Sequence, residues 1–458
     1  MKSTAYLTKE ALLKRAQEII GIPLGTIDRT GRLSTGKGAI GTMIEENWFG
    51  YAPNSEAEPD FPEAGVELKA TPYLRNARGD IRAKERLVCN IINYMEEYDR
   101  TFRTSSFWHK CNTMLLMSYE HFKDKPKTEY HIDKAILFSF PEADLIIIEQ
   151  DWERIMDKVR RGLAHEISEG DTLYLAACTK GANAATVRRQ PFSEIPAKQR
   201  AYSLKSSYMT QILNKFVFGE QEDEHIIKNW QLLANRTFEE YVIGKVSPYF
   251  GKTQEALKAI LGVESTAKNL NELLLAKMLG INGKISNSEE FKKAGILPKT
   301  IRIQRNGSIT ECMSFPKFDF IALSQESVWE ESELYNMLAP TKFLFVIFRE
   351  RNEHEYVFER VQFWNMPNED LDEVGRVWER TVQTIREGVK LYPTARGIGN
   401  NLPKASESSV AHVRPHGRNA SDKAPLPDGR MMTKQCFWLN NSYVKKQIMK
   451  ECDTAKPI

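Results

Sequence analysis

Two carboxylates and a lysine stand close together in the segment Asp60-Phe-Pro-Glu-Ala-Gly-Val-Glu67-Leu-Lys69. Glu67 and Lys69 are two residues apart, so in an extended strand both side chains leave the same face. Asp60 comes just before Phe61-Pro62, a context that predicts a turn leaning over that face. Because Mg2+ is usually held by one or two carboxylates plus substrate phosphate, we predict Asp60 and Glu67 as its ligands. Lys69 would steady the attacking water and the phosphate, which is the chemistry of a metal-dependent phosphodiesterase.

The Glu-x-Lys spacing alone is a weak signal. A second copy occurs at Glu290-Phe-Lys292, and charged pairs at this spacing usually belong to a solvated strand face. The flank of the first copy is more specific, because a turn carboxylate, a proline and a glycine precede alternating apolar residues. That alternation predicts a strand that begins near Glu67 and points Val66 and Leu68 into a core.

The flank also carries a family resemblance. Asp60-Phe-Pro through Gly65-Val-Glu-Leu-Lys69 resembles the signature of the MutH family, whose members fold as PD-(D/E)xK nucleases and cut at GATC. The resemblance implies two further active-site residues: an acidic residue on a helix, placed here at Glu46, and a second lysine, Lys110. It also implies DNA contacts from two later segments, at Lys180 and Asn183 in Thr179-Lys-Gly-Ala-Asn-Ala184 and at Ser203 and Lys205 in Arg200-Ala-Tyr-Ser-Leu-Lys205.

Over its whole length the chain resembles one subgroup more closely, the GATC-cutting type II restriction endonucleases of the Sau-three-A-I kind. These enzymes carry a catalytic MutH-like half and a MutH-like half without catalytic function. The resemblance implies that both strands are cut before the G and that a second bound GATC stimulates cleavage. It further implies double-stranded DNA as substrate, a homodimer on DNA as one assembly, and a methyltransferase of the same system as a functional partner. The family position that senses adenine methylation is a tyrosine in mismatch-repair members but Ser203 here, so strict dependence on hemimethylated DNA is not expected.

Lys180 can donate to guanine O6 and N7, and Asn183 has the geometry to pair with adenine. Asn183 can equally stabilise its own loop, which is the commoner role of an asparagine between small residues.

A degenerate internal repeat accounts for the length of the chain. The segment from Phe61 to Ala70 aligns with Phe291 to Thr300, Trp152 with Trp378, and Tyr202 with Phe437. We therefore predict two tandem MutH-like nuclease-fold domains of the α/β class, each a mixed sheet flanked by helices. The predicted boundaries are 1–220 for the catalytic domain, 221–235 for a polar linker and 236–458 for an inactive DNA-binding domain.

The second copy lacks the residues that a metal site needs. Glu67 aligns with Leu297 and Glu46 with Ala276, so this copy should not cut. A basic segment aligns with the Lys180 loop, and its predicted DNA contacts are Arg414, His416 and Arg418. An effector domain would retain such a loop, although a purely structural remnant is the alternative. The residues from Gly397 to Ser409 predict a long irregular loop.

The amino-acid composition limits the functional classes that the protein can belong to. The 458 residues are 41% hydrophobic with a formal net charge of +3, so the chain can bury two cores and its net charge neither demands nor excludes nucleic acid. Six scattered cysteines and the lack of an apolar span predict a cytoplasmic protein without membrane attachment. Two alternatives stay open: a mismatch-repair nicking enzyme activated by partner proteins, and a DNA-binding protein in which both copies are inactive.

Overall fold

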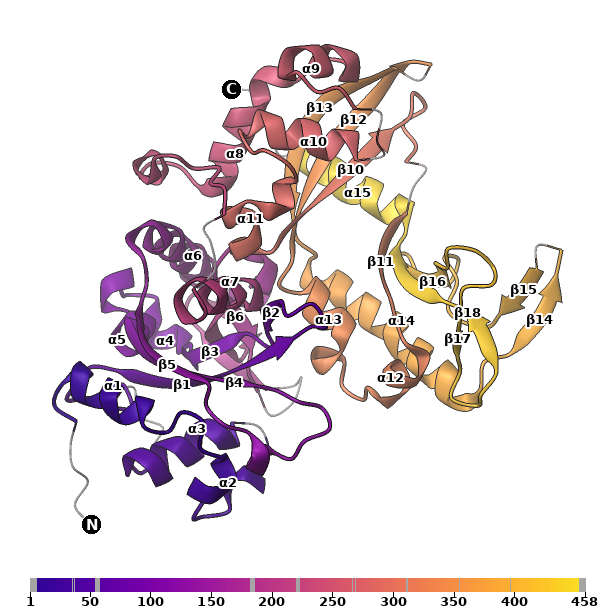
Figure 1. Cartoon of the computed structure of the whole chain (residues 1–458). Coiled ribbons are helices and arrows are strands. Elements are labelled where there is room, and N and C mark those ends of the chain that lie inside the picture. The colour runs from indigo at the N-terminus through magenta and orange to yellow at the C-terminus, as the bar shows by residue number, and fades with distance from the viewer. Residues whose placement is uncertain are drawn as a thin grey trace. The chain divides into compact units, whose positions relative to one another are not determined.

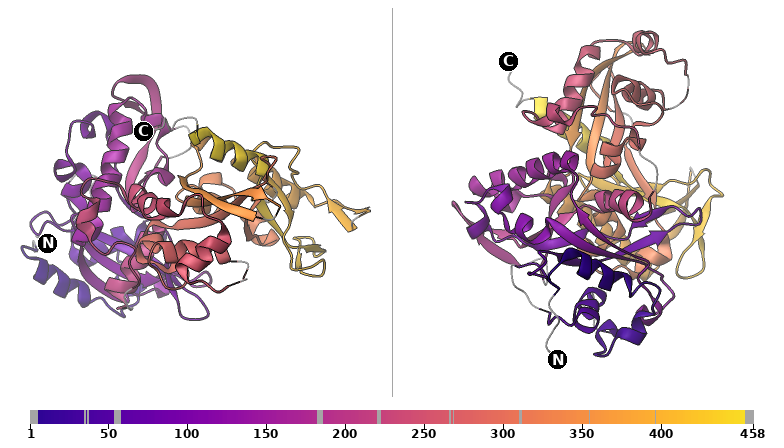
Figure 2. Two further views of the ribbon diagram at one scale, coloured as in Figure 1. Left: turned by 90° about the horizontal axis from the view of Figure 1, so that it is seen from above. Right: turned by 60° about the vertical axis from the view of Figure 1, so that its left-hand side comes forward.

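The computed structural model describes residues 6–34, 36, 38–53, 58–181, 186–219, 223–265, 267, 269–309, 312–353, 355–395 and 397–452. The chain forms two compact units (Figures 1 and 2). Unit 1 comprises Met1–Tyr241 and Ile281–Ile296, and unit 2 comprises Val242–Gly280 and Leu297–Ile458. The chain thus passes between the units at three points, whereas the sequence predicted one linker at 221–235.

Unit 1 contains a mixed sheet in the order β2-β1-β4-β5 and an antiparallel sheet in the order β3-β9-β6. In the first sheet β1 runs parallel to β4, while the β1–β2 and β4–β5 pairs are antiparallel. A hairpin of β7 and β8 completes the strands. The strands are β1 (Glu67–Arg75), β2 (Ile81–Ala83), β3 (Leu87–Ile91), β4 (Thr113–Glu120), β5 (Lys134–Ser139), β6 (Leu175–Thr179), β7 (Val187–Gln190), β8 (Ser193–Lys198) and β9 (Arg200–Leu204).

Helices flank these sheets. They are α1 (Lys9–Gln17), α2 (Leu24–Ile27), α3 (Ala39–Met43), α4 (Tyr94–Glu97), α5 (Ser106–Cys111), α6 (Glu142–Arg160), α7 (Ser206–Ile212) and α11 (Glu289–Ala294), with π-helical turns η2 (Ile44–Phe49) and η7 (Leu213–Val217). One core cluster joins α1, α3 and η2 to the apolar residues of β1 and β4. Helix α8 (Phe238–Val246) crosses from unit 1 into unit 2. Within the described part of the chain, no helix has both the length and the apolar character of a membrane span.

Unit 2 repeats this topology. Its sheets have the orders β10-β12-β13 and β11-β19-β16, and two separate hairpins are formed by β14–β15 and β17–β18. The strands are β10 (Ile296–Ile303), β11 (Met313–Lys317), β12 (Lys342–Asn352), β13 (Glu355–Trp364), β14 (Leu391–Thr394), β15 (Gly397–Asn400), β16 (Ala411–Pro415), β17 (Lys423–Pro425), β18 (Met431–Thr433) and β19 (Gln435–Leu439). The helices are α9 (Gln254–Leu261), α10 (Leu270–Met278), α12 (Phe320–Gln325), α13 (Glu333–Leu338), α14 (Asn368–Glu387) and α15 (Asn441–Cys452). The irregular loop predicted from Gly397 to Ser409 is wrong over its first part, which forms β15.

The two units share most of their elements, although β2 has no counterpart in the described part of unit 2. The trio β10-β12-β13 corresponds to β1-β4-β5, and β11-β19-β16 corresponds to β3-β9-β6. The long helix that precedes the last sheet is α6 in unit 1 and α14 in unit 2, and a helix follows the central strand of that sheet in both units. The predicted α/β class with mixed sheets and flanking helices is therefore confirmed.

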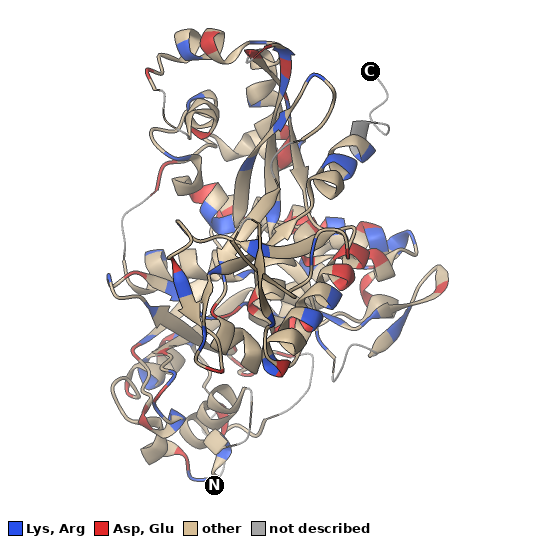
Figure 3. Ribbon diagram, turned by 90° about the vertical axis from the view of Figure 1, so that its right-hand side faces the viewer, with Lys and Arg blue, Asp and Glu red and all other residues tan. Residues whose placement is uncertain are grey.

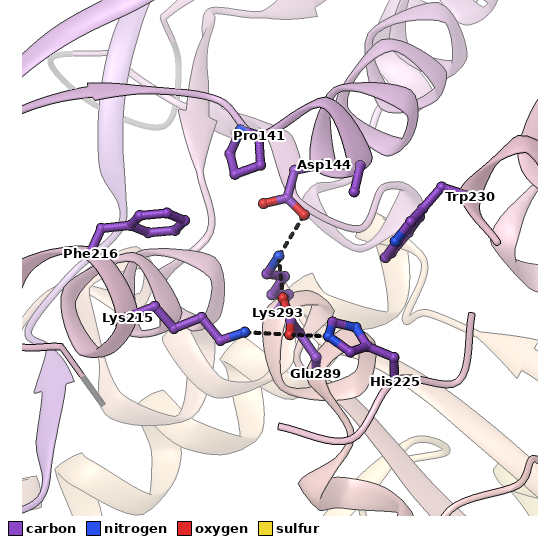
Figure 4. Close-up of a pocket in the computed structure, with 9 residues that line it drawn as sticks. Pro141, Asp144, Lys215, Phe216, His225, Trp230, Glu289 and Lys293 are labelled. Carbon is purple, nitrogen blue, oxygen red and sulfur yellow. Dashed lines mark hydrogen bonds and ion pairs between the residues drawn. The ribbon is translucent and has the colours of Figure 1, made fainter. Parts of the chain in front are cut away.

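Helix α11 packs in unit 1 although the sequence repeat assigns it to the second copy. Figure 4 shows Lys215, His225 and Lys293 gathered around Glu289 at a pocket of about 320 Å³. Lys293 Nζ lies 2.7 Å from Glu289 and 2.5 Å from Asp144, both of which are buried. Lys215 also pairs with Glu289, and His225 Nε2 lies 3.1 Å from it. These ion pairs offset the cost of burying the charges of α11.

Asp151 of α6 holds the start of β6. Its Oδ1 accepts the backbone N–H of Leu173 at 2.8 Å, and its Oδ2 accepts those of Tyr174 at 2.6 Å and Leu175 at 2.9 Å. All four residues are buried, so water cannot replace the carboxylate as the hydrogen-bond acceptor for these three N–H groups. The carboxylate of Asp151 thus fixes the strand that leads to the predicted DNA loop.

Replacing Asp151 with alanine should strongly destabilise the protein, because three buried N–H groups lose their acceptor. We expect a loss of about 3 kcal/mol or more and a clearly lower urea midpoint. Asp157→Ala on the same helix is the control, because its pair with Arg161 is solvent-exposed and worth about 0.5 kcal/mol or less. Equal midpoints for the two variants would contradict the role of Asp151.

Candidate active site

A tight turn places Asp60 beside the start of β1. Phe61 and Val66 exchange two backbone hydrogen bonds of 3.0 and 3.2 Å, and Gly65 lies in the left-handed conformation that closes the turn. The backbone N–H of Asp60 donates to Glu67 Oε2 at 3.1 Å, and the N–H of Leu68 donates to Asp60 Oδ2 at 3.0 Å. The backbone N–H of Asp60 thus orients the Glu67 carboxylate, and the backbone N–H of Leu68 orients the Asp60 carboxylate.

Glu67 is the centre of the site. It is only 2% exposed, its Oε1 lies 2.8 Å from Lys69 Nζ, and the same oxygen lies 3.7 Å from Lys110 Nζ. Burial raises the pKa of Glu67, Lys69 counteracts that rise, and Asp60 adds to it. Strand β4, paired with β1 through Glu67 and Met114, and helix α5, which carries Lys110, hold these groups in register.

Lys69 lies between the carboxylate and a strand of the second sheet. Its Nζ donates to Glu67 and lies 3.4 Å from the carbonyl oxygen of Cys89 on β3. Burial alone would lower the pKa of Lys69, but the charge of Glu67 raises it above its ordinary value. Lys69 therefore carries a positive charge at neutral pH.

The acidic helical residue that faces the site is Glu45, not the predicted Glu46. Glu46 accepts a hydrogen bond from Arg32 Nε at 2.9 Å and one from Thr30 at 3.3 Å, on the outer side of η2. Glu45 is 9% exposed, and burial together with the charges of Asp60 and Glu67 raises its pKa to about 7. Within the described residues, its buried Oε1 has no hydrogen-bond partner.

The contact between this helix and β1 explains why Glu45 and not Glu46 faces the site. Gly41 lies four residues earlier, which is one helical turn, and a Cβ added to it would meet Ala70 of β1 at 3.8 Å. The helix face that touches β1 thus includes position 41 and, one turn later, position 45. Glu45 also lies in a π-helical turn, a distortion that is frequent at functional sites.

The donor set fits a hard divalent cation. In the parts of the chain that the structure describes, no three histidine, cysteine, aspartate or glutamate side chains form a ready metal-binding group. However, the charges of Asp60 and Glu67 both raise the pKa of Glu45, and the Oε1 of Glu45 is buried without a partner among the described residues. Oxygen ligands of this kind suit Mg2+, whose charge would offset their mutual repulsion.

The predicted DNA contacts of unit 1 divide into two groups. Lys180 is exposed just after β6, and its backbone N–H donates to the carbonyl of Gln199 at 2.9 Å. Asn183 lies outside the described residues. Ser203 and Lys205 are buried at the end of β9, where Lys205 Nζ donates to the carbonyl of Thr172 at 2.5 Å. Both side chains are therefore turned into the protein.

The predicted contacts of unit 2 lie on and just after β16. The guanidinium of Arg414 stacks 3.9 Å above the Trp438 ring, and the His416 ring packs against the same tryptophan. Arg418 is exposed, and its backbone N–H donates to Asp422 Oδ2 at 3.0 Å. Hydrogen bonds from Lys434 and the Arg418 backbone hold the pKa of Asp422 well below its usual range. Figure 3 shows basic and acidic residues interspersed along the ribbon in this view.

Among its described residues, unit 2 has no counterpart of the carboxylate cluster. Leu297 on β10 is 40% exposed at the position of Glu67, and Ala276 is buried. Lys299 is retained at the position of Lys69, and burial lowers its pKa. The remaining acid, Glu290, accepts the backbone N–H groups of Ile226 and Ile227 in unit 1, each at 3.0 Å.

A family model and several known proteins match this chain. The family model of the DNA mismatch repair enzyme MutH matches residues 49–151, a range that contains Asp60, Glu67, Lys69 and Lys110. The DNA mismatch repair protein MutH of Shewanella woodyi is 28% identical over 46% of this chain and 93% of its own length. That of Haemophilus influenzae is 29% identical over 46% of this chain and 96% of its own length.

The Type II restriction enzyme Sau3AI of Staphylococcus aureus is 39% identical over 97% of this chain and 99% of its own length. The similarity thus covers both units, whereas the MutH proteins match less than half of the chain. The chain therefore belongs to the MutH-like type II restriction enzymes of the Sau3AI kind, a family of site-specific deoxyribonucleases.

Proposed function

We propose that the protein recognises double-stranded GATC and hydrolyses both strands 5′ of the guanine in a Mg2+-dependent reaction. Unit 1 cuts, and unit 2 binds a second GATC site as an allosteric effector, so that occupation of one site changes events at the other. The observation that carries the catalytic part is the cluster of Glu45, Asp60 and Glu67 beside Lys69. The absence of such a cluster among the described residues of unit 2 supports the division of labour.

In the proposed mechanism, Glu45, Asp60 and Glu67 would hold Mg2+, which would supply a Lewis acid for the scissile phosphate and lower the pKa of a water molecule. The ammonium group of Lys69 orients the attacking water and offsets the negative charge that develops on the phosphate. Lys110, 3.7 Å from Glu67, adds a second positive charge on the same side of the carboxylate. Burial of Glu67 and Lys69 strengthens these interactions because little water screens them.

The proposed DNA surface of unit 1 combines Lys180 with the exposed Arg188 and Arg189 of β7. Asn183 stays a predicted adenine contact, whereas the buried Ser203 and Lys205 are left out of this surface. Gln199 braces the loop, since its side chain donates to the Lys180 carbonyl at 2.5 Å and accepts from Arg188 Nε at 2.7 Å. In unit 2 the proposed contacts are Arg414, His416 and Arg418.

We also propose a homodimer on DNA, a methyltransferase of the same system as functional partner, and the cytoplasm as compartment. The described cysteines are free thiols, which is their usual state in a reducing compartment. A nicking enzyme of the mismatch-repair type is less well supported, because the relative that matches both units is a restriction enzyme.

Glu45→Gln should lower the rate of plasmid cleavage at least about a hundredfold, like Glu67→Gln, because a charged group of the reaction centre is lost. Glu46→Gln is the matched control, since the neighbouring carboxylate pairs with Arg32 outside the site. We expect it to keep its rate within about threefold, a change of under 1 kcal/mol in the barrier. Initial rates on supercoiled plasmid in saturating Mg2+ measure the difference. The assignment fails if Glu46→Gln is the inactive variant and Glu45→Gln is active.

The metal-free protein should lose stability relative to Glu45→Gln as the pH rises from 5 to 8. In the folded state the pKa of Glu45 is raised from 4.5 to about 7. The contribution of its bound proton to the free energy of unfolding is therefore complete below pH 4.5 and is lost as the pH passes through 7. The difference should reach on the order of 2 kcal/mol. Thermal midpoints of both proteins in EDTA at several pH values test this, and a pH-independent difference would contradict it. Added Mg2+ should stabilise the wild-type protein most at the higher pH.

Plasmids with zero, one or two GATC sites, incubated with Mg2+ or with EDTA, test the proposed specificity and coupling. We expect cutting only with Mg2+ and only at GATC, with four-base 5′ overhangs on sequencing, and faster cutting of the two-site plasmid. Equal rates per site on the one-site and two-site plasmids would reject the effector role of unit 2 and leave the nuclease assignment intact. Cutting at other sequences would reject GATC.

A further inference from the structure

Helix α11 occupies in the second copy the place that the turn with Asp60 occupies in the first. Gly65 comes just before β1, Gly295 comes just before β10, and both glycines have a φ angle of +64°. The turn from Asp60 to Gly65 therefore corresponds to α11, in which Glu290 has the position of Asp60. The second copy has thus replaced a turn that carries a site carboxylate with a helix that packs in unit 1.

The charged side chains of α11 all have partners within unit 1, and Figure 4 shows those that line the pocket around Glu289. The pairs are Glu289 with Lys215, Glu290 with the backbone N–H groups of Ile226 and Ile227, Lys292 with Asp223, and Lys293 with Asp144. Loss of one partner from a buried pair is strongly destabilising. Helix α11 is therefore firmly held on unit 1.

Helix α7 is the element of unit 1 on which α11 packs most directly. Ser207 Oγ donates to the carbonyl of Lys293 at 2.9 Å, and a Cβ added to Gly295 would come within 3.0 Å of the same hydroxyl oxygen. The neighbouring Tyr208 donates to Asp144 Oδ2 at 2.9 Å, and this carboxylate also pairs with Lys293. A shift of α11 would therefore either move α7 or break these contacts.

Helix α7 is joined in turn to the sheet that carries the site. Thr210 Oγ1 accepts the backbone N–H of Ala83 on β2 at 3.0 Å. Strand β2 pairs antiparallel with β1, which begins at Glu67. Leu213 of η7, which continues α7, packs with Tyr73 of β1 in one buried apolar cluster. Helices α11 and α7 and strands β2 and β1 thus form an unbroken series of contacting elements within unit 1.

The other end of this series is joined to unit 2 by the chain itself. Only Gly295 separates α11 from β10, and β10 belongs to unit 2 from Leu297 onward. Strand β10 corresponds to β1, the strand at which unit 1 would act on DNA. DNA that unit 2 binds in the equivalent way would therefore lie at the strand that follows α11.

We propose that α11 is the coupling element through which DNA bound by unit 2 raises the cleavage rate of unit 1, an inference that rests on the proposed effector function. DNA on unit 2 shifts β10 and with it α11. Because α11 is held on α7 by buried contacts, α7 and β2 follow, and the position of β1 with Glu67 and Lys69 changes. Small shifts are passed on in this way because packed interfaces do not deform continuously.

The test measures how fast the full chain cuts one-site and two-site plasmids in Mg2+, and how many GATC duplexes it binds in EDTA. Thr210→Val keeps the shape of the side chain and removes the hydroxyl that accepts from Ala83. Stimulation by a second site, about fivefold or more in the wild type, should fall below about twofold. The one-site rate should stay within about threefold, a change of under 1 kcal/mol in the barrier. Two duplexes should still bind per chain.

Lys293→Met combined with Asp144→Asn should have the same effect, because it removes a buried ion pair without leaving one charge unpaired. Thr384→Val on α14 is the matched control, since its hydroxyl donates to the carbonyl of Arg380 on an exposed helix face. This control should keep full stimulation. Urea midpoints establish which variants are folded, and Thr210→Val decides alone if the double variant does not fold.

Thr210→Val with full stimulation overturns the proposal. A folded Thr210→Val that binds only one duplex also overturns it, since α7 would then affect binding and not its transmission. In both cases the effector function of unit 2 stands if the wild type is stimulated by a second site. A wild-type chain that cuts both plasmids at equal rates per site overturns the effector function and the coupling together.

Discussion

The rest of unit 1 depends on one constraint. Three carboxylates lie close together where little water reaches them. Glu45 and Glu67 are buried, and the negative charge of Asp60 beside them raises the pKa of both. Lys69 and Lys110 and the backbone N–H groups of Asp60 and Leu68 counteract part of this repulsion. The positions of those groups require the turn before β1, the pairing of β1 with β4, and α5 all at once. A proton on Glu45 or a bound cation can supply the charge that the protein itself does not provide.

The second copy keeps the scaffold and loses this constraint. Ser105 and Ser332 cap α5 and α13 by the same contact, each accepting from the N–H three residues later, so these helices occupy equivalent places before β4 and β12. Counting from the caps, Met337 stands where Lys110 stands in unit 1. Because a leucine stands in unit 2 at the position of Glu67, a lysine at the position of Met337 would have no carboxylate to pair with. An apolar residue at that position therefore carries no free-energy penalty. The fold is maintained by its apolar pattern, while the chemistry depends on a handful of polar positions.

The sequence was sufficient for those parts of the site that depend on local spacing. Asp60, Glu67 and Lys69 could be predicted to lie together because strand alternation and a proline-containing turn act over a few residues, and the α/β class followed from the helical and strand-like segments within each copy. The choice between Glu45 and Glu46 could not be made in the same way, because it depends on which helix face touches Ala70. Ser203 and Lys205 were predicted DNA contacts, yet the pairing of β9 with β3 and β6 buries them, which is a tertiary effect. The docking of α11 in unit 1 likewise depends on ion pairs with residues far away in the sequence, such as Asp144.

Retention of an acid at an aligned position is weak evidence of catalysis in such a duplicated fold. Glu290 lies in the second copy close to the position of Asp60, but both of its oxygens accept buried backbone N–H groups. Its charge is thus already satisfied by the fold, and recruiting it to a metal would leave the amides of Ile226 and Ile227 unpaired. Glu45 has the opposite state, with a buried oxygen that has no partner among the described residues and a pKa raised toward neutrality. An unsatisfied buried oxygen has a free-energy cost that a ligand, a proton or a water molecule can remove, and this difference from Glu290 supports the proposed catalytic role of Glu45.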